Sequence, residues 1–115
     1  MLTIDELAAA IRSVSTEEPA QRLADLLLAW KRDETTADEL KAHIERAIGY
    51  IWFSTDIVHR EVYRLWSEFR TYAIDGIGGM TMNERPHWFG LFQHFNDAES
   101  EEARARIYAK LLARP

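Results

Sequence analysis

The chain contains no cysteine. Disulfide bonds, zinc sites built on thiolates and a cysteine nucleophile are therefore excluded. Long apolar runs are also missing, because the longest, Leu26–Trp30 and Ile48–Phe53, are far shorter than the roughly 20 residues needed to cross a bilayer. The first residues, Met1–Glu6, carry acid where a signal peptide carries base. We therefore expect a soluble, cytoplasmic protein with no membrane contact.

Positive charge is in deficit, with 14 lysines and arginines against 19 aspartates and glutamates and a net charge of −5. A nucleic-acid partner normally requires a basic face that displaces phosphate counterions, so this balance argues against one. It is compatible with a basic protein partner. With 47% hydrophobic and 29% charged residues, the chain is predicted to form one globular domain, residues 1–115.

Helix starts recur along the chain. Thr3 and Glu6, and again Thr36 and Glu39, have the Thr-x-x-Glu spacing of a capping box, in which hydroxyl and carboxylate each bind a free amide of the first turn. Apolar residues follow each start with helical spacing, and no alternating strand pattern of useful length occurs. The fold is predicted to be an all-α bundle of about six short-to-medium helices. Further helices are expected to start at residues 15–19 and 54–56, and a last one to run from about Ala98 to Ala113.

Two helices are predicted around a glycine-rich turn. An apolar stripe from Val58 to Ala73 marks the fourth helix, with Gly76 as its natural terminator. For the fifth helix, both Thr81 and Asn83 could serve as the cap. A Thr81 cap would place Pro86 at the fifth helical position, where the missing amide and the ring both destabilise, so Asn83 is the predicted cap.

All the aromatic residues except Trp30 and Tyr108 lie between Tyr50 and Phe95. Helical spacing places most of this segment in the core: Trp66, Phe69, Trp88, Leu91, Phe92 and Phe95 are expected to face inward. Trp52-Phe53 and His87-Trp88 lie at junctions between helices instead. Aromatic residues at such junctions can be exposed, and tryptophan, tyrosine and arginine are enriched at binding hot spots.

Candidate catalytic and metal-binding residues are sparse. Asp56-x-x-His59 and Glu84-x-x-His87 have the spacing of the ligand pairs in di-iron helical bundles. Both pairs fall in predicted first turns, where a carboxylate interacts favourably with the helix dipole, and no further glutamates lie at matched depths. The Gly76-x-Gly78-Gly79 turn follows a helix and lacks a Gly-Lys-Ser ending, so it is predicted to terminate a helix rather than bind phosphate. We predict no enzyme, no metal site and no cofactor.

One segment carries a resemblance. Gly79-Met80-Thr81-Met82-Asn83-Glu84-Arg85, with Gly90-Leu91-Phe92 and Phe95-Asn96-Asp97 after it, is similar to the Gly-Met-Thr-x-Asn-Glu-Arg element of small, uncharacterised bacterial all-α proteins. Some of these resemble immunity proteins of toxin systems. The resemblance implies an inhibitor that binds a toxin, and it brings no catalytic residue.

These observations lead to one functional hypothesis and two alternatives. The leading hypothesis is a non-enzymatic protein-binding domain, in its most concrete form an immunity-type inhibitor that masks a basic toxin domain. The first alternative is a structural or adaptor protein that acts as a homodimer, and the second, a metal-dependent enzyme, is disfavoured. The contact surface is predicted around the glycine turn and the junction before the fourth helix. Its residues are Trp52, Asp56, Asp75, Glu84, Arg85 and His87.

Overall fold

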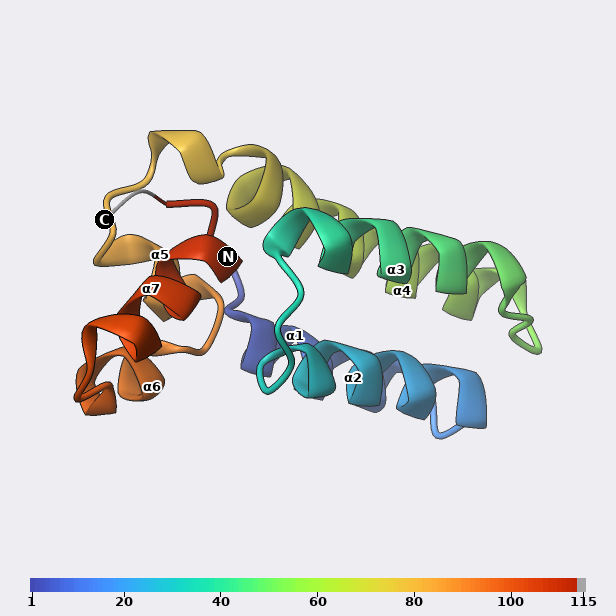
Figure 1. Ribbon diagram of the computed structural model, residues 1–115. Coiled ribbons are helices and arrows are strands. Elements are labelled where there is room, and N and C mark those ends of the chain that lie inside the picture. The colour runs from blue at the N-terminus through green and yellow to red at the C-terminus, as the bar shows by residue number, and fades with distance from the viewer. Residues whose placement is uncertain (114–115) are drawn as a thin grey trace.

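The computed structural model describes residues 1–113, and it begins with an antiparallel helix pair. Helix α1 (Ile4–Val14) starts at the predicted capping box of Thr3 and Glu6, which is confirmed. Helix α2 (Glu18–Trp30) follows after a three-residue turn, with Pro19 in its first turn as predicted. The two helices pack side by side (Figure 1). Ion pairs of Arg12 with Asp25 and of Lys31, directly after α2, with Asp5 join them.

A second pair of helices lies along the first. Helix α3 (Ala37–Tyr50) packs against α2, and α4 (Asp56–Phe69) packs against α1. Both starts are as predicted: the Thr36 and Glu39 capping box is formed, and the Thr55 hydroxyl accepts a hydrogen bond from the Val58 amide. Figure 1 shows these four helices running along the long axis of the molecule, whose Cα extents are 47 × 24 × 20 Å.

The fourth helix changes its winding before it ends. The α-helical part stops at Phe69, and the chain continues as a π-helix, η1 (Arg70–Asp75), and then a 3-10 turn, η2 (Ile77–Gly79). The prediction of a terminator at Gly76 is confirmed. A Cβ atom at Gly76 would lie 2.5 Å from the Tyr72 carbonyl oxygen, so the chain can leave the π-helix there only without a side chain. Ala73 and Ile74 of this π-helix are buried in the core.

The predicted fifth helix is wrong in its length, because the chain forms two short helices there. These are α5 (Glu84–Trp88) and α6 (Phe92–Asp97). Gly90 separates them with φ = +65°, a left-handed conformation that an α-helix cannot contain. The last helix, α7 (Glu101–Lys110), is also shorter than predicted at both ends. The Ser100 hydroxyl caps its start, and Leu112, with φ = +56°, turns the chain just after its end.

The start of α5 directly after Asn83 is as predicted, but the prediction that the Asn83 side chain caps it is wrong. Asn83 directly precedes α5, but its backbone is already helical and its side chain makes no capping hydrogen bond. Thr81 caps instead: its hydroxyl accepts from the Glu84 amide at 3.3 Å, and the Glu84 carboxylate accepts from the Thr81 amide at 3.4 Å. Pro86 is accommodated because the regular helix starts only at Glu84, so proline still lies in its first turn.

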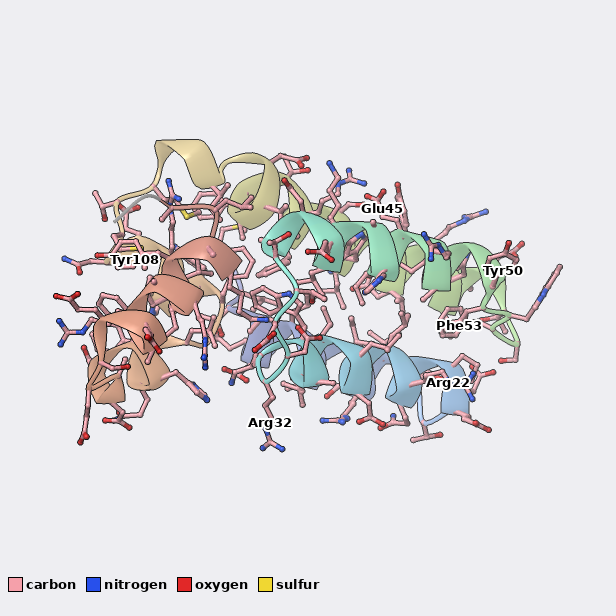
Figure 2. The ribbon with its side chains drawn as sticks, viewed as in Figure 1. Arg22, Arg32, Glu45, Tyr50, Phe53 and Tyr108 are labelled. Atoms are coloured by element: carbon pink, nitrogen blue, oxygen red, sulfur yellow. The ribbon has the colours of Figure 1, made fainter. Side chains whose placement is uncertain are left out.

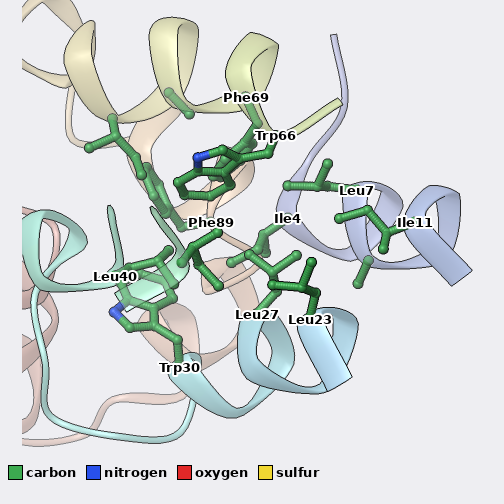
Figure 3. Close-up of a cluster of buried hydrophobic side chains, with 14 of the residues drawn as sticks. Ile4, Leu7, Ile11, Leu23, Leu27, Trp30, Leu40, Trp66, Phe69 and Phe89 are labelled. Carbon is green, nitrogen blue, oxygen red and sulfur yellow. The ribbon is translucent and has the colours of Figure 1, made fainter. Parts of the chain in front are cut away.

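An aromatic chain connects the three short helices to the four long ones. Phe89 is fully buried between Trp30 of α2, at 5.4 Å between ring centroids, and Phe69 of α4, at 5.5 Å (Figure 3). The inward prediction is confirmed for Trp66, Phe69 and Leu91. It is wrong for Phe92, which is 52% exposed, because the break at Gly90 rotates α6 and gives the buried position to Phe89.

A buried lysine makes a second connection between the two parts. Lys110, at the end of α7, is 6% exposed, and its ammonium lies 4.0 Å from the centroid of the Trp30 ring. It donates to the backbone carbonyls of Asp33 (2.7 Å) and Thr35 (2.9 Å) and to the Asp33 carboxylate (3.0 Å). These bonds fix the loop between α2 and α3 to the last helix.

The all-α prediction is confirmed, with seven α-helices and no strand in residues 1–113. Over the same residues, none of the helices combines the length and the apolar character that a membrane crossing requires.

Candidate functional site

The predicted contact residues fall into two groups at opposite ends of a helix. Trp52 shortly precedes α4 and Asp56 begins it, whereas Asp75 ends its π-helical extension and Glu84, Arg85 and His87 follow in α5. Helix α4 alone has 14 residues, which is about 20 Å at 1.5 Å per residue. The structure therefore does not bring the six residues together on one compact surface.

The first group belongs to an exposed apolar surface, which we call the tip (residues 50–57). Tyr50 is 81% exposed, Trp52 89% and Ile57 78%. Between them the chain leaves α3 at Ile51, whose backbone is extended. Ile51 and Phe53 pack against the core, whereas Trp52 between them points outward, the alternation of an extended segment. Figure 2 shows Tyr50 and Phe53 at the end of the molecule remote from α7.

The tip is held in place by one carboxylate. Glu17, in the turn between α1 and α2, accepts a hydrogen bond from the Ser54 amide at 2.9 Å and another from the Ser15 hydroxyl at 2.9 Å. The hydroxyl and the amide lower the pKa of Glu17 below its ordinary value, because both bonds favour the ionised form. The tip is therefore attached to the turn of the first helix pair.

The surroundings of the tip are electrically mixed. A recess of about 290 Å³ lies beside Tyr50 and Trp52, and Glu18 and Arg22 of α2 form part of its wall. These two residues pair with each other at 3.2 Å, whereas Asp56 and Arg60 at the start of α4 form no ion pair within residues 1–113. A surface with exposed aromatic side chains and a polar surround has the composition of a protein interface.

Sequence reasoning missed Tyr50 and Ile57 as members of this surface. Their signal is weak: Ile57 falls outside the apolar stripe of its helix, and Tyr50 directly follows Gly49 near the end of another. An apolar residue outside a stripe is the pattern that could have identified them.

The second group is largely engaged within the chain. Asp75 pairs with Lys41 at 2.8 Å, which raises the pKa of the lysine, and with Arg70 at 3.8 Å. The Glu84 carboxylate accepts hydrogen bonds from the amide and the hydroxyl of Thr81 at the start of α5. Asp75, Glu84 and His87 are all exposed, and the His87 side chain makes no hydrogen bond or ion pair within residues 1–113 but meets the Trp88 ring edge-on at 5.0 Å.

Arg85 has a structural role that the sequence did not indicate. Its guanidinium donates to the carbonyls of Leu111 (3.0 Å) and Leu112 (2.9 Å) and to that of Met80 (3.3 Å). The carbonyls of Leu111 and Leu112 lie directly after the end of α7, so Arg85 caps that helix from another part of the chain. The side chain predicted as a contact anchor is thereby committed to the fold.

The histidines do not gather with carboxylates. His59 of the Asp56-x-x-His59 pair lies beside the Phe53 ring at 5.8 Å between centroids. Within residues 1–113, no group of three or more histidine, aspartate or glutamate side chains is arranged to hold a metal ion.

Comparison of the chain with protein-family models, with curated proteins and with solved structures gives no match. The candidate site therefore rests on the geometry of the tip.

Proposed function

We propose that this chain is a non-enzymatic protein-binding domain and that the tip is its contact surface. The observation that carries the proposal is the exposure of Tyr50, Trp52 and Ile57, each at least 78% exposed, on a segment that Glu17 holds in place. Keeping large apolar side chains in water is unfavourable, so a partner that covers them gains their burial. Because the tip is already ordered, little conformational entropy is lost on binding.

The most concrete form of the proposal is an immunity-type inhibitor of a toxin. Two features support it: the resemblance of residues 79–97 to small bacterial proteins, and a net charge of −5, which would speed association with a basic toxin domain by electrostatic steering. The alternative is a homodimeric adaptor. It has its own support, because an apolar surface of this kind can pair with a second copy of itself about a twofold axis.

Oligomeric state is the first test. Sedimentation velocity over a wide concentration range distinguishes a monomer from a dimer that dissociates on dilution. If a dimer forms and Trp52→Ala abolishes it while Phe92→Ala does not, the homodimer replaces the immunity-type inhibitor. Phe92 is the matched control, because it is an exposed aromatic residue on α6, away from the tip.

For a monomer, the second test is partner capture at low salt followed by affinity measurement. Trp52→Ala is expected to weaken binding by about 2 kcal/mol or more, roughly 30-fold, as central anchors do. Phe92→Ala is expected to leave the affinity unchanged. If the captured protein is toxic when expressed alone, co-expression of the wild-type chain should relieve toxicity and the Trp52→Ala variant should relieve it less. If Trp52→Ala and Phe92→Ala bind the partner with equal affinity, the tip is not the contact surface.

A further inference from the structure

The last two helices, α6 and α7, contribute little to the hydrophobic core. Within residues 92–113, which include both helices, Leu111 is the one member of the buried apolar cluster of the molecule, and Ile107 packs against this cluster half-buried. Helix α1 alone contributes four residues to the cluster: Ile4, Leu7, Ala8 and Ile11. Because burial of apolar surface is the main favourable term in folding, residues 92–113 are held less firmly than helices α1–α4.

The polar and aromatic contacts of these two helices are internal to the pair. The Gln93 amide donates to Asp97 at 2.9 Å, and the ring centroids of Phe95 and Tyr108 lie 5.9 Å apart. In the described part of the chain, no hydrogen bond or ion pair joins residues 92–109 to helices α1–α4. A groove of about 600 Å³ lies between the pair and the loop after α2, so packing there is incomplete. Figure 1 shows α6 and α7 beside one end of the four long helices.

The strong attachments of this segment to the rest of the molecule gather at residues 110–112, which we call the latch. Lys110 binds the loop after α2, and Leu111 is fully buried in the core. The Arg85 guanidinium, from α5, donates to the carbonyls of Leu111 and Leu112. Since these contacts lie within three consecutive residues, breaking them together releases the C-terminal end of the segment in one step.

The other end of the segment begins directly after a break in the helical backbone. Leu91 is buried, and its amide donates to the Pro86 carbonyl at 2.8 Å, so the chain up to this point is fixed to α5. The left-handed conformation of Gly90 prevents α5 and α6 from forming one continuous helix. Helices α6 and α7 have 6 and 10 residues, and isolated helices shorter than about 12–15 residues are marginal in water. Once the latch is released, neither helix is long enough to hold the other in place.

We propose that residues 92–113 form a flap, which opens as one unit after the break at Gly90 while helices α1–α4 stay folded. Opening withdraws Lys110 from the Trp30 ring, which is 2% exposed in the closed form, and frees the loop after α2. The open form therefore uncovers an apolar surface that the closed form hides, and a ligand that binds this surface would shift the population towards the open form. The flap is independent of the protein-binding function of the tip.

Native-state hydrogen exchange of the full chain, followed by two-dimensional amide NMR, measures the opening. Each exchange rate is divided by the rate of the same amide in an unstructured chain. The amides of α6 and α7 are expected to exchange at least tenfold faster than the slowest amides of α1 and α4. Two matched variants then assign the opening unit. Ala105→Gly lies in the middle of α7 and Ala9→Gly in the middle of α1, and both alanines are exposed. Glycine for alanine inside a helix favours its unfolding about fivefold.

The flap predicts a distinct pattern for each variant. Ala105→Gly should speed exchange about fivefold in both α6 and α7, because one opening event releases both helices. Ala9→Gly should speed exchange of the slowest amides of α1–α4 about fivefold and leave α6 and α7 unchanged, because α1 stays folded when the flap opens. If Ala9→Gly speeds exchange in α7 equally, α7 opens only when the whole chain unfolds, and the proposal is overturned. If Ala105→Gly speeds exchange in α7 but not in α6, the two helices open separately, which also overturns it. Neither outcome bears on the tip.

Discussion

Replacement of Lys110 by methionine should destabilise the protein by about 2–3 kcal/mol, although the apolar stem is kept. The wild-type residue is 6% exposed, and its ammonium makes three hydrogen bonds, two of them to the backbone carbonyls of Asp33 and Thr35. Methionine cannot donate, so both carbonyls lose a charged partner. A hydrogen bond to a charged group is worth about 1.5–3 kcal/mol, and removing one member of a buried ion pair costs about 3–5 kcal/mol.

The expected loss is smaller than the cost of breaking a fully buried ion pair because the partner carboxylate, that of Asp33, is accessible to water. The Asp33 side chain is 47% exposed, so water can solvate it when the lysine is gone. Burial also lowers the pKa of Lys110, which shows that part of the gain from its bonds is spent on desolvation. The loss therefore comes mainly from the two carbonyls and from the contact with the Trp30 ring.

Urea denaturation followed by circular dichroism measures the effect. Lys41→Met is the matched control, because Lys41 pairs with Asp75 at the surface, where such pairs contribute about 0–1 kcal/mol. We expect a clear drop in the urea midpoint for Lys110→Met, with the same m-value as the wild type, and a small change for Lys41→Met. A loss below about 0.5 kcal/mol at Lys110 would refute the conclusion that this residue connects α7 to the loop after α2.

Three further predictions concern other parts of the fold. Gly90→Ala should cost about 1–2 kcal/mol in denaturant melts because φ is +65°, whereas Gly79→Ala, which meets no atom within 4 Å, should be neutral or stabilising by up to about 1 kcal/mol. Thr81→Ala should cost about 1 kcal/mol and Asn83→Ala less, and the reverse order would restore Asn83 as the cap. Since the pKa of Glu17 is lower in the folded than in the unfolded protein, the ionised carboxylate stabilises the fold. This stabilisation is fully present above the unfolded pKa and is lost as the pH falls through the folded pKa. The stability difference between wild type and Glu17→Gln should therefore shrink as the pH of the melts is lowered through that acidic range, and a difference independent of pH would argue against the ionised contact.

Local signals explain which parts of the fold were predictable. A capping box involves four adjacent residues, so Thr3 and Thr36 could be assigned from spacing alone. The same logic failed at Thr81, because the argument from Pro86 assumed regular helix from the cap onward, whereas the chain forms a turn before Glu84. Phe92 was predicted to be buried because helical periodicity gives no sign of the left-handed conformation of Gly90.

The contact residues were harder to predict because their roles depend on distant parts of the chain. Arg85 binds carbonyls 26 and 27 residues away, and Lys110 binds a loop more than 70 residues away. Contacts between residues so far apart in the chain leave no local pattern from which they could be predicted. Trp52 could be proposed as exposed because it lies at a junction, but the contribution of Ile57 depends on how α4 packs against α1.

The central claim, that the tip is a contact surface, is tested most directly by photo-crosslinking in living cells that express the protein. A photoreactive phenylalanine analogue is placed at position 57 of the tip, which is 78% exposed, or at the control position 92 on α6, which is 52% exposed. The account predicts a discrete crosslinked product from position 57, to a partner protein or to a second copy of the chain, and none from position 92. A product from position 92 alone would contradict it.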